Sequence, residues 1–200
     1  MSDDPQHDLQ PDPLLIGGVP KPPLALLPDP VALFQGRARR FAFLAQDHEL
    51  AAYLRFLAEL SRLQARLAVT LPPLASVASA AAMRAAQVHM PPIDRHALVE
   101  DPALAATLQA LLDDAGGLEM PDAARVALDA VRLADAVDRR WLLGNVLGDD
   151  IPVDSAAPHL FAAAAVQVHL ARLAAGLDAE ALVPIATGVC PACAIAQARH

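Results

Sequence analysis

Apolar residues recur every three or four positions along residues 50–71, and this spacing constrains the fold more than any other feature. Residues so spaced line one stripe of an α-helix. Charged residues occupy the other face, where Glu59 and Arg62 are spaced to form an ion pair. Pro72 and Pro73 lack the amide hydrogen that a helix interior requires, so they end the segment. The pattern predicts a long amphipathic helix whose buried stripe comprises Leu50, Tyr53, Leu54, Leu57, Leu60, Leu63, Leu67 and Leu71.

The rest of the chain has the composition of an all-α protein. Alanine is abundant and aromatic residues make up 4%, so helix formers outnumber strand formers. Asp29 before Pro30 and Asp101 before Pro102 are typical helix starts, and Gly176 is a typical helix end. These patterns predict a bundle of five to seven helices, with segments over residues 29–47, 48–71, 74–89, 101–112, 121–143 and 155–176.

Two helices late in the chain carry further expectations. The segment 155–176 is apolar nearly all round and is expected at the centre of the bundle. The segment 121–143 is expected to bury one stripe, and residues 144–152 are expected to form a loop. Trp141, the only tryptophan, is expected to fill the core, with a partner surface as the alternative. The expected stripe comprises Val126, Ala130, Leu133, Val137 and Trp141.

Proline content and the cysteines divide the chain into three parts. Residues 1–29 contain many prolines and predict a flexible lead, disordered for the most part. Residues 30–183 form the predicted helical domain. Residues 184–200 contain both cysteines, Cys190 and Cys193, and read as the incomplete start of a metal-binding domain of the rubredoxin or zinc-ribbon type.

Charge is unevenly distributed over a chain whose formal net charge is -8. An acidic chain is a poor candidate for nucleic-acid binding, which depends on neutralised phosphates. Residues 31–70 are basic, and Arg39, Arg40 and Arg55 are candidate docking residues for a partner protein. The alternative is that these arginines only solvate a helix face or pair with Asp47 and Glu59. No signal peptide or membrane span is evident, which predicts a cytoplasmic location.

The sharpest local motif is Cys190-Pro191-Ala192-Cys193. Two thiolates at this spacing can bind one metal ion, but a closed tetrahedral site needs four ligands. His200 is a possible third ligand, and a homodimer could pool four thiolates. A thiol–disulfide active site is the redox alternative, although no strand–helix unit of the thioredoxin type precedes the motif. Two reduced thiols without a special role is the simplest alternative.

Sequence motifs of catalysis are missing, which predicts that the chain is not an enzyme and has no catalytic residues. There is no HExxH, GxSxG, P-loop or GxGxxG. The histidines do not cluster in sequence, and His159 and His169 are not expected on one helix face. The adjacent carboxylates at 113–114 and 149–150 are typical of polar loops.

Several segments in order resemble the FdhE family of formate dehydrogenase accessory proteins, over roughly residues 30–193. The first helices are similar at residues 39–41 with Leu44, then at residues 53–58 with Gln64. The loop 90–94 resembles a Pro-Pro-Leu-Asp-like loop of that family. The Ala-rich segment 162–173 is similar to the family's central helix at Gln167-Val168 and Ala171-Arg172-Leu173. The cysteine segment 188–193 looks like the family's first metal-binding knuckle.

The resemblance implies a cytoplasmic maturation factor that formate dehydrogenase needs for activity and that binds its catalytic subunit. It also implies that full-length members hold iron or zinc, with Cys190 and Cys193 as two of the ligands. In the family, a glycine follows the second cysteine of the motif, and further CxxC pairs come later. In this chain Ala194 follows Cys193, and seven residues in all come after that cysteine. The resemblance therefore implies a truncation or frame change after Cys193, and an incomplete metal site. Two rivals remain, a thiol oxidoreductase with Cys190 as nucleophile and a metal-free helical adaptor.

Overall fold

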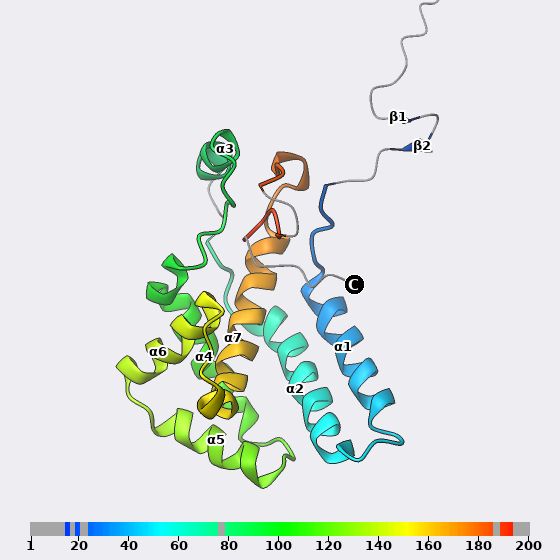
Figure 1. Cartoon of the computed structure of the whole chain (residues 1–200), viewed down its shortest axis with the longest axis vertical. Helices are drawn as coiled ribbons and strands as arrows, with labels where there is room; N and C mark the ends of the chain where they lie inside the picture. The colour runs from blue at the N-terminus through cyan, green and yellow to red at the C-terminus, as the bar shows by residue number, and fades with distance from the viewer. Residues whose placement is uncertain (1–14, 17–18, 21–23, 76–78, 186–188, 194–200) are drawn as a thin grey trace, which may run out of the picture.

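The computed structural model describes residues 15–16, 19–20, 24–75, 79–185 and 189–193, and the protein is all-α there apart from one short ribbon (Figure 1). Seven α-helices lie in these residues, within the predicted five to seven. Strands β1 (Leu15–Ile16) and β2 (Val19–Pro20) pair antiparallel, with Ile16 opposite Val19. Two-residue strands leave no periodicity to detect, so the sequence did not predict them. Most of the lead lies outside the described residues, so its flexibility stays a prediction.

Helices α1 (Pro30–Leu44) and α2 (Ala51–Thr70) lie side by side as a helical hairpin (Figure 1). The predicted start at Asp29 is confirmed, because its Oδ1 atom accepts a hydrogen bond from the Ala32 N–H at 3.0 Å. The predicted ion pair between Glu59 and Arg62 is also present. The expected stripe of α2 is buried at Leu60, Leu63 and Leu67, but Leu50 and Tyr53 at its start are exposed.

Helix α3 (Ser79–Gln87) is shorter than the predicted segment 74–89 and extends away from the bundle in Figure 1. A 3-10 turn, η1 (Ala97–Glu100), leads into α4 (Pro102–Ala115). Asp101 caps α4 as expected, because its Oδ1 accepts the Ala103 N–H at 2.8 Å.

The segment 121–143, predicted as one helix, is two helices, α5 (Asp122–Leu133) and α6 (Ala136–Gly148). The chain turns at Ala134 and Asp135, where the Asp135 carboxylate accepts the N–H groups of Val137 and Asp138 at 2.8 and 2.9 Å. This side-chain cap competes with continuation of α5, a competition that apolar spacing does not reveal. The loop predicted over residues 144–152 is also wrong for residues 144–148, which are the last turn of α6.

The stripe predicted for this segment is wrong, because α5 buries a different face. Val126, Leu133, Val137 and Trp141 are 70%, 88%, 73% and 51% exposed. Ala130 is exposed as well. The buried face of α5 comprises Ala124, Ala127, Leu128 and Val131 instead.

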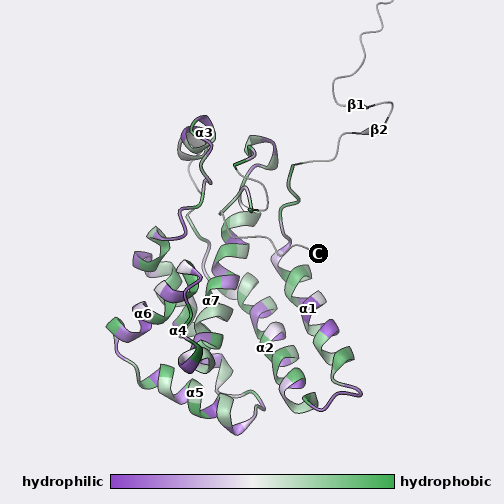
Figure 2. Ribbon diagram, viewed as in Figure 1, coloured by the Kyte–Doolittle hydropathy of each residue, from purple (hydrophilic) through white to green (hydrophobic). Residues whose placement is uncertain are grey.

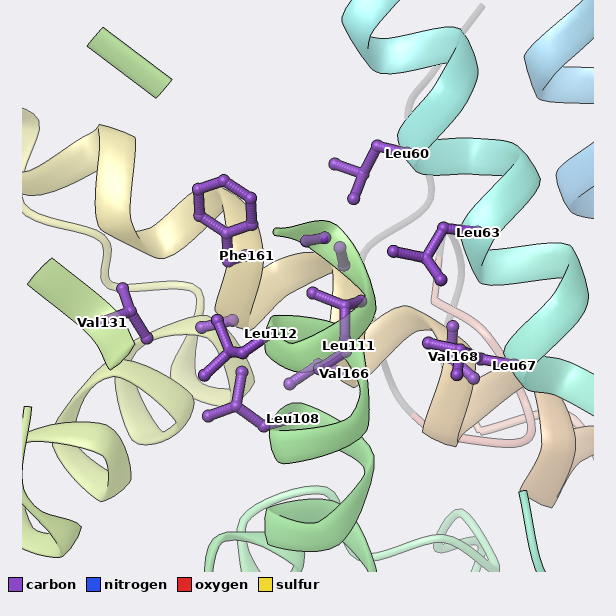
Figure 3. Packing of buried hydrophobic residues seen from close by; sticks show 14 of the residues in the cluster. Leu60, Leu63, Leu67, Leu108, Leu111, Leu112, Val131, Phe161, Val166 and Val168 are labelled. Atoms are coloured by element: carbon purple, nitrogen blue, oxygen red, sulfur yellow. The ribbon is translucent and has the colours of Figure 1, made fainter. Parts of the chain in front are cut away.

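Helix α7 (Ala156–Ala175) occupies the centre of the bundle, as predicted, and contacts α1, α2, α4, α5 and α6. It follows the 3-10 turn η2 (Val153–Ser155) and precedes η3 (Ala179–Ala181). Figure 3 shows Phe161, Val166 and Val168 of α7 beside leucines of α2 and α4. In Figure 2, hydrophilic and hydrophobic residues alternate along the outer helices α1, α5 and α6. This pattern is typical of helices with one solvent-exposed face. None of the described helices is both long enough and apolar enough to cross a lipid bilayer.

Polar side chains join α7 to the α1–α2 hairpin. Gln64 donates to the Ala164 carbonyl at 2.9 Å and to Gln167 Oε1 at 3.2 Å, and the same Oε1 accepts a hydrogen bond from Arg37. Arg172 donates to the Leu71 carbonyl at the end of α2 at 3.0 Å. Gln64, Gln167 and Arg172 all belong to the segments that resemble the FdhE family. In this structure these side chains hold the bundle together.

A buried histidine is expected to make stability depend on pH. The His169 side chain is fully buried on α7, and its Nε2 lies 3.3 Å from Asp101 Oδ2. Burial lowers the pKa of His169 below its usual 6.5, Asp101 opposes that shift, and Arg172 adds to it. Between the lowered value and 6.5, the unfolded chain binds a proton that the folded chain does not. We expect the free energy of unfolding to fall as pH drops through this window, by at most about 1.4 kcal/mol per pH unit.

Urea unfolding at a series of pH values between neutral and mildly acidic measures this slope. The control is His169→Leu, which has no titrating group at this position and should lose this part of the slope. An identical slope in both proteins would assign the pH dependence to other groups.

Candidate functional site

The cysteine turn (residues 190–193) rests on the loop that precedes η1. The Ile93 N–H donates to the Ala192 carbonyl at 3.0 Å, and both residues are buried. Asp94 accepts the N–H groups of His96 and Ala97 at 3.1 and 3.3 Å, which fixes the start of η1. Two segments that resemble the FdhE family, the loop 90–94 and the cysteine turn, are therefore hydrogen-bonded to each other.

Within the turn, the two thiol groups interact. The hydrogen bond from the Cys193 side chain lowers the pKa of Cys190 to about 5, burial opposes the shift, and the backbone N–H groups of Ala192 and Cys193 add to it. Cys190 is half-buried and Cys193 is buried. A thiol with this pKa is a thiolate at neutral pH, which is the form that binds metals and attacks electrophiles. The arrangement suits the first half of a zinc or iron site, in which a thiolate accepts backbone hydrogen bonds.

The described residues bring no further ligand to this pair. Nowhere in residues 24–75, 79–185 and 189–193 do three histidine, cysteine or carboxylate side chains gather as a metal site would require. His89, Asp94, His96 and Cys193 line one open groove of about 490 Å³. The His89 ring is engaged with the Pro184 carbonyl at 3.1 Å. His200, the possible third ligand, lies outside the described residues.

The arginines of α1 and α2 fall into two groups. Arg37 is half-buried, lies 5.4 Å from the Phe34 ring centre and bonds to Gln167. Arg62 and Arg66 form ion pairs with Glu59 and Asp114. A second group of three is exposed and forms no ion pair with any residue that the structure describes. We call this group the basic face, and it comprises Arg39, Arg40 and Arg55, the three candidate docking residues.

The alternative that these arginines pair with Asp47 or Glu59 finds no ion pair among the described residues, where Glu59 pairs with Arg62. Arg55 also lines a groove between α2 and residues 119–121. Three cations with no ionic partner within the described chain can receive carboxylates of another molecule.

The structure also places residues that sequence reasoning misjudged. Trp141 was expected in the core but is half-exposed, with its ring edge-on to His159 at a centroid distance of 5.2 Å. His159 is buried, and its ring contacts the Ser155 carbonyl at 2.7 Å and Asn145 Nδ2 at 3.2 Å. The spacing of His159 to Ser155, one helical turn, was the signal in the sequence that could have indicated this contact.

These features define the class of protein: an all-helical domain with a CxxC turn that is hydrogen-bonded to the loop before η1. The chain belongs to the FdhE family of formate dehydrogenase accessory proteins, because the family description "FdhE, N-terminal" matches residues 22–187.

Known relatives support this family assignment. A "Protein FdhE homolog" of Rhizobium meliloti is 51% identical over 185 residues, which cover 92% of this chain and 60% of that protein. Another from Stutzerimonas stutzeri is 38% identical over 154 residues, 74% of this chain and 48% of that protein. The crystal structure of the FdhE protein from Pseudomonas aeruginosa superposes with a TM-score of 0.74 at 31% identity, over 88% of this chain and 61% of that one. The chain thus spans about 60% of the length of the Rhizobium relative.

Proposed function

We propose that this chain is the helical part of a maturation factor that formate dehydrogenase requires for activity. It binds the catalytic subunit in the cytoplasm and performs no catalysis itself. The observation that carries the proposal is the family match over residues 22–187, which includes the whole helical bundle. The basic face supplies the contact with the catalytic subunit, because Arg39, Arg40 and Arg55 are exposed and without ionic partners among the described residues.

Deletion of the gene in its own host tests the requirement. We expect cells without this protein to contain the catalytic subunit but to lose most formate dehydrogenase activity, and a plasmid copy to restore it. Fractionation of the complemented cells checks the location, with the protein expected in the cytoplasmic fraction. Undiminished formate dehydrogenase activity in the deletion strain would reject the proposal.

The cysteine turn contributes half of a metal site. The thiolate form of Cys190, the adjacent Cys193 and the backbone hydrogen bonds in the turn support iron or zinc as the metal. The remaining ligands come from outside residues 24–193, either from a longer form of the protein or from a second copy in a homodimer. When bound, the metal would hold the turn in one conformation.

We expect the isolated chain to hold zinc or iron weakly, with far less than one metal ion retained per chain after dialysis. Two thiolates leave at least half of the coordination sphere to water, and affinity comes from a closed set of ligands. Metal analysis combined with a native mass measurement checks this result, with Cys190→Ser/Cys193→Ser as the metal-free control. One retained metal ion in a monomer would contradict the half-site, whereas one per dimer would indicate pooled thiolates.

The lowered pKa of Cys190 also favours a second candidate, a thiol–disulfide oxidoreductase with Cys190 as nucleophile. Thioredoxin-like enzymes place the nucleophile at a helix N-terminus, whereas here Cys190 is followed by a turn at residues 191–193. Catalysed reduction of insulin by dithiothreitol, lost in Cys190→Ser, would favour this candidate. The third reading, a metal-free adaptor, predicts that the double serine variant supports full formate dehydrogenase activity.

A further inference from the structure

An apolar pocket of about 420 Å³ opens where the start of α7 meets α5 and the start of α2. It is lined by Tyr53, Pro121, Ala123, Ile151, His159 and Leu160, among others. The Trp141 ring lies 5.2 Å, centroid to centroid, from the ring of the lining residue His159. Such a volume accommodates one large apolar side chain.

Two large apolar residues of the lining are exposed, and so are Trp141, which contacts the lining residue His159, and Val153, two positions after Ile151. Trp141 is 51% exposed, Ile151 42% and Tyr53 39%, and the nearby Val153 is 95% exposed. Exposed apolar and aromatic residues gathered around a pocket are typical of a protein-binding site. Binding energy at such sites concentrates on a few anchors that fill a pocket.

Three carboxylates are close in sequence to residues that line the pocket. Asp122 lies between the lining residues Pro121 and Ala123, Asp150 precedes Ile151, and Asp154 lies two positions before Ala156, which also lines the pocket. All three are exposed and form no ion pair with a described residue.

Arg95 and Arg125 already bind other groups of this chain. Arg95 bonds to Asp149 at 2.5 Å. Arg125 donates to the carbonyls of Gly116 and Leu118 at 3.0 and 2.7 Å. The carboxylates Asp122, Asp150 and Asp154, which neighbour lining residues in the sequence, therefore keep their negative charge without an ionic partner in the described part of the chain.

We propose that this pocket binds a partner segment that inserts one large apolar side chain and carries arginine or lysine residues on either side of it. The apolar lining fits the anchor, and Asp122, Asp150 and Asp154 fit the flanking cations. The proposal goes beyond the function proposed above, because the pocket requires a basic partner segment whereas the basic face requires an acidic one. Its test contains no formate dehydrogenase, so the two proposals fail independently.

The test measures binding of a fluorescein-labelled peptide in which one Phe is flanked by two Arg on each side, in a Gly/Ser background. Two matched peptides replace the Phe by Ser, or all Arg by Glu. We expect the wild-type chain to bind the Arg–Phe peptide saturably, the Ser peptide about tenfold more weakly, and the Glu peptide not at all.

Protein variants assign that binding to the pocket. We expect Asp122→Asn/Asp150→Asn/Asp154→Asn to weaken binding about tenfold and to flatten its salt dependence. Ala123 is exposed, so Ala123→Phe fills the pocket without disturbing the core and should also weaken binding about tenfold. The matched controls are Asp47→Asn/Asp129→Asn/Asp138→Asn, with the same change in net charge, and Ala130→Phe on α5. Both controls should bind within about twofold of wild type.

Three results would overturn the proposal: no saturable binding of the Arg–Phe peptide by the folded wild type, equal binding of the Glu peptide, or equal weakening by variants and controls. A wild-type dimer that Ala123→Phe converts to a monomer would also overturn it, because the pocket would then belong to a second copy of this chain.

Discussion

Replacement of Phe161 by alanine is expected to lower the free energy of unfolding by about 3–5 kcal/mol. Phe161 is fully buried on the central helix, and its ring centre lies 6.2 Å from that of Phe56 on α2. Figure 3 shows it beside the leucines of α4. Removal of the ring leaves a cavity shared by three helices that cannot all move to close it. Because a domain is stable by only about 5–15 kcal/mol, much of the stability would be lost.

The matched control for this substitution is Val126→Ala. Val126 was expected in the core from its spacing, but it is 70% exposed on α5. We therefore expect its replacement to change stability by no more than about 0.5 kcal/mol. Urea unfolding followed by circular dichroism measures both changes. A large loss in Val126→Ala would mean that Val126 is buried, and would contradict the buried face of α5 described above.

Reversal of the basic face is expected to weaken capture of the formate dehydrogenase catalytic subunit about 100-fold. The variant is Arg39→Glu/Arg40→Glu/Arg55→Glu. Because these side chains are exposed and lack ionic partners in the described chain, their replacement should leave the fold intact. Like charges placed against the carboxylates of a partner repel it, so the loss should be largest at low salt.

The control reverses the same number of charges elsewhere, at Arg66, Arg84 and Arg140. Arg66 and Arg140 form exposed ion pairs with Asp114 and Glu100, each at a distance of 3.4 Å. Exposed ion pairs of this kind contribute little to stability. A pull-down of the catalytic subunit compares the two variants with wild type. Equal loss of capture by the control would indicate a general effect of net charge rather than a docking face.

Local patterns predicted most of the fold. The caps at Asp29 and Asp101, the ion pair of Arg62 and the central position of α7 all depend on residues a few positions apart, and all are present. The split of residues 122–148 was missed, because it depends on whether Asp135 caps a new helix or points to solvent. Apolar spacing is nearly the same in the two cases, so only packing against α7 decides between them.

The candidate site was only partly predictable, because a sequence shows local motifs but not contacts between distant segments. The cysteine turn follows from a four-residue motif. Its docking on Ile93 joins segments about a hundred positions apart, and no local pattern predicts that contact. The three candidate arginines were chosen on charge alone, and only the structure separates them from Arg37, Arg62 and Arg66, which have partners. The apolar pocket was missed, because its lining comes from four separate segments of the chain.

Titration of the purified catalytic subunit with this chain tests whether the two proteins bind each other. Isothermal titration calorimetry at several salt concentrations yields the affinity and its dependence on charge. We expect saturable binding with a Kd of about 1 μM or lower at low salt, weaker binding as salt rises, and a loss of affinity in the basic-face variant. A folded wild-type chain that shows no saturable binding would rule out the catalytic subunit as its partner.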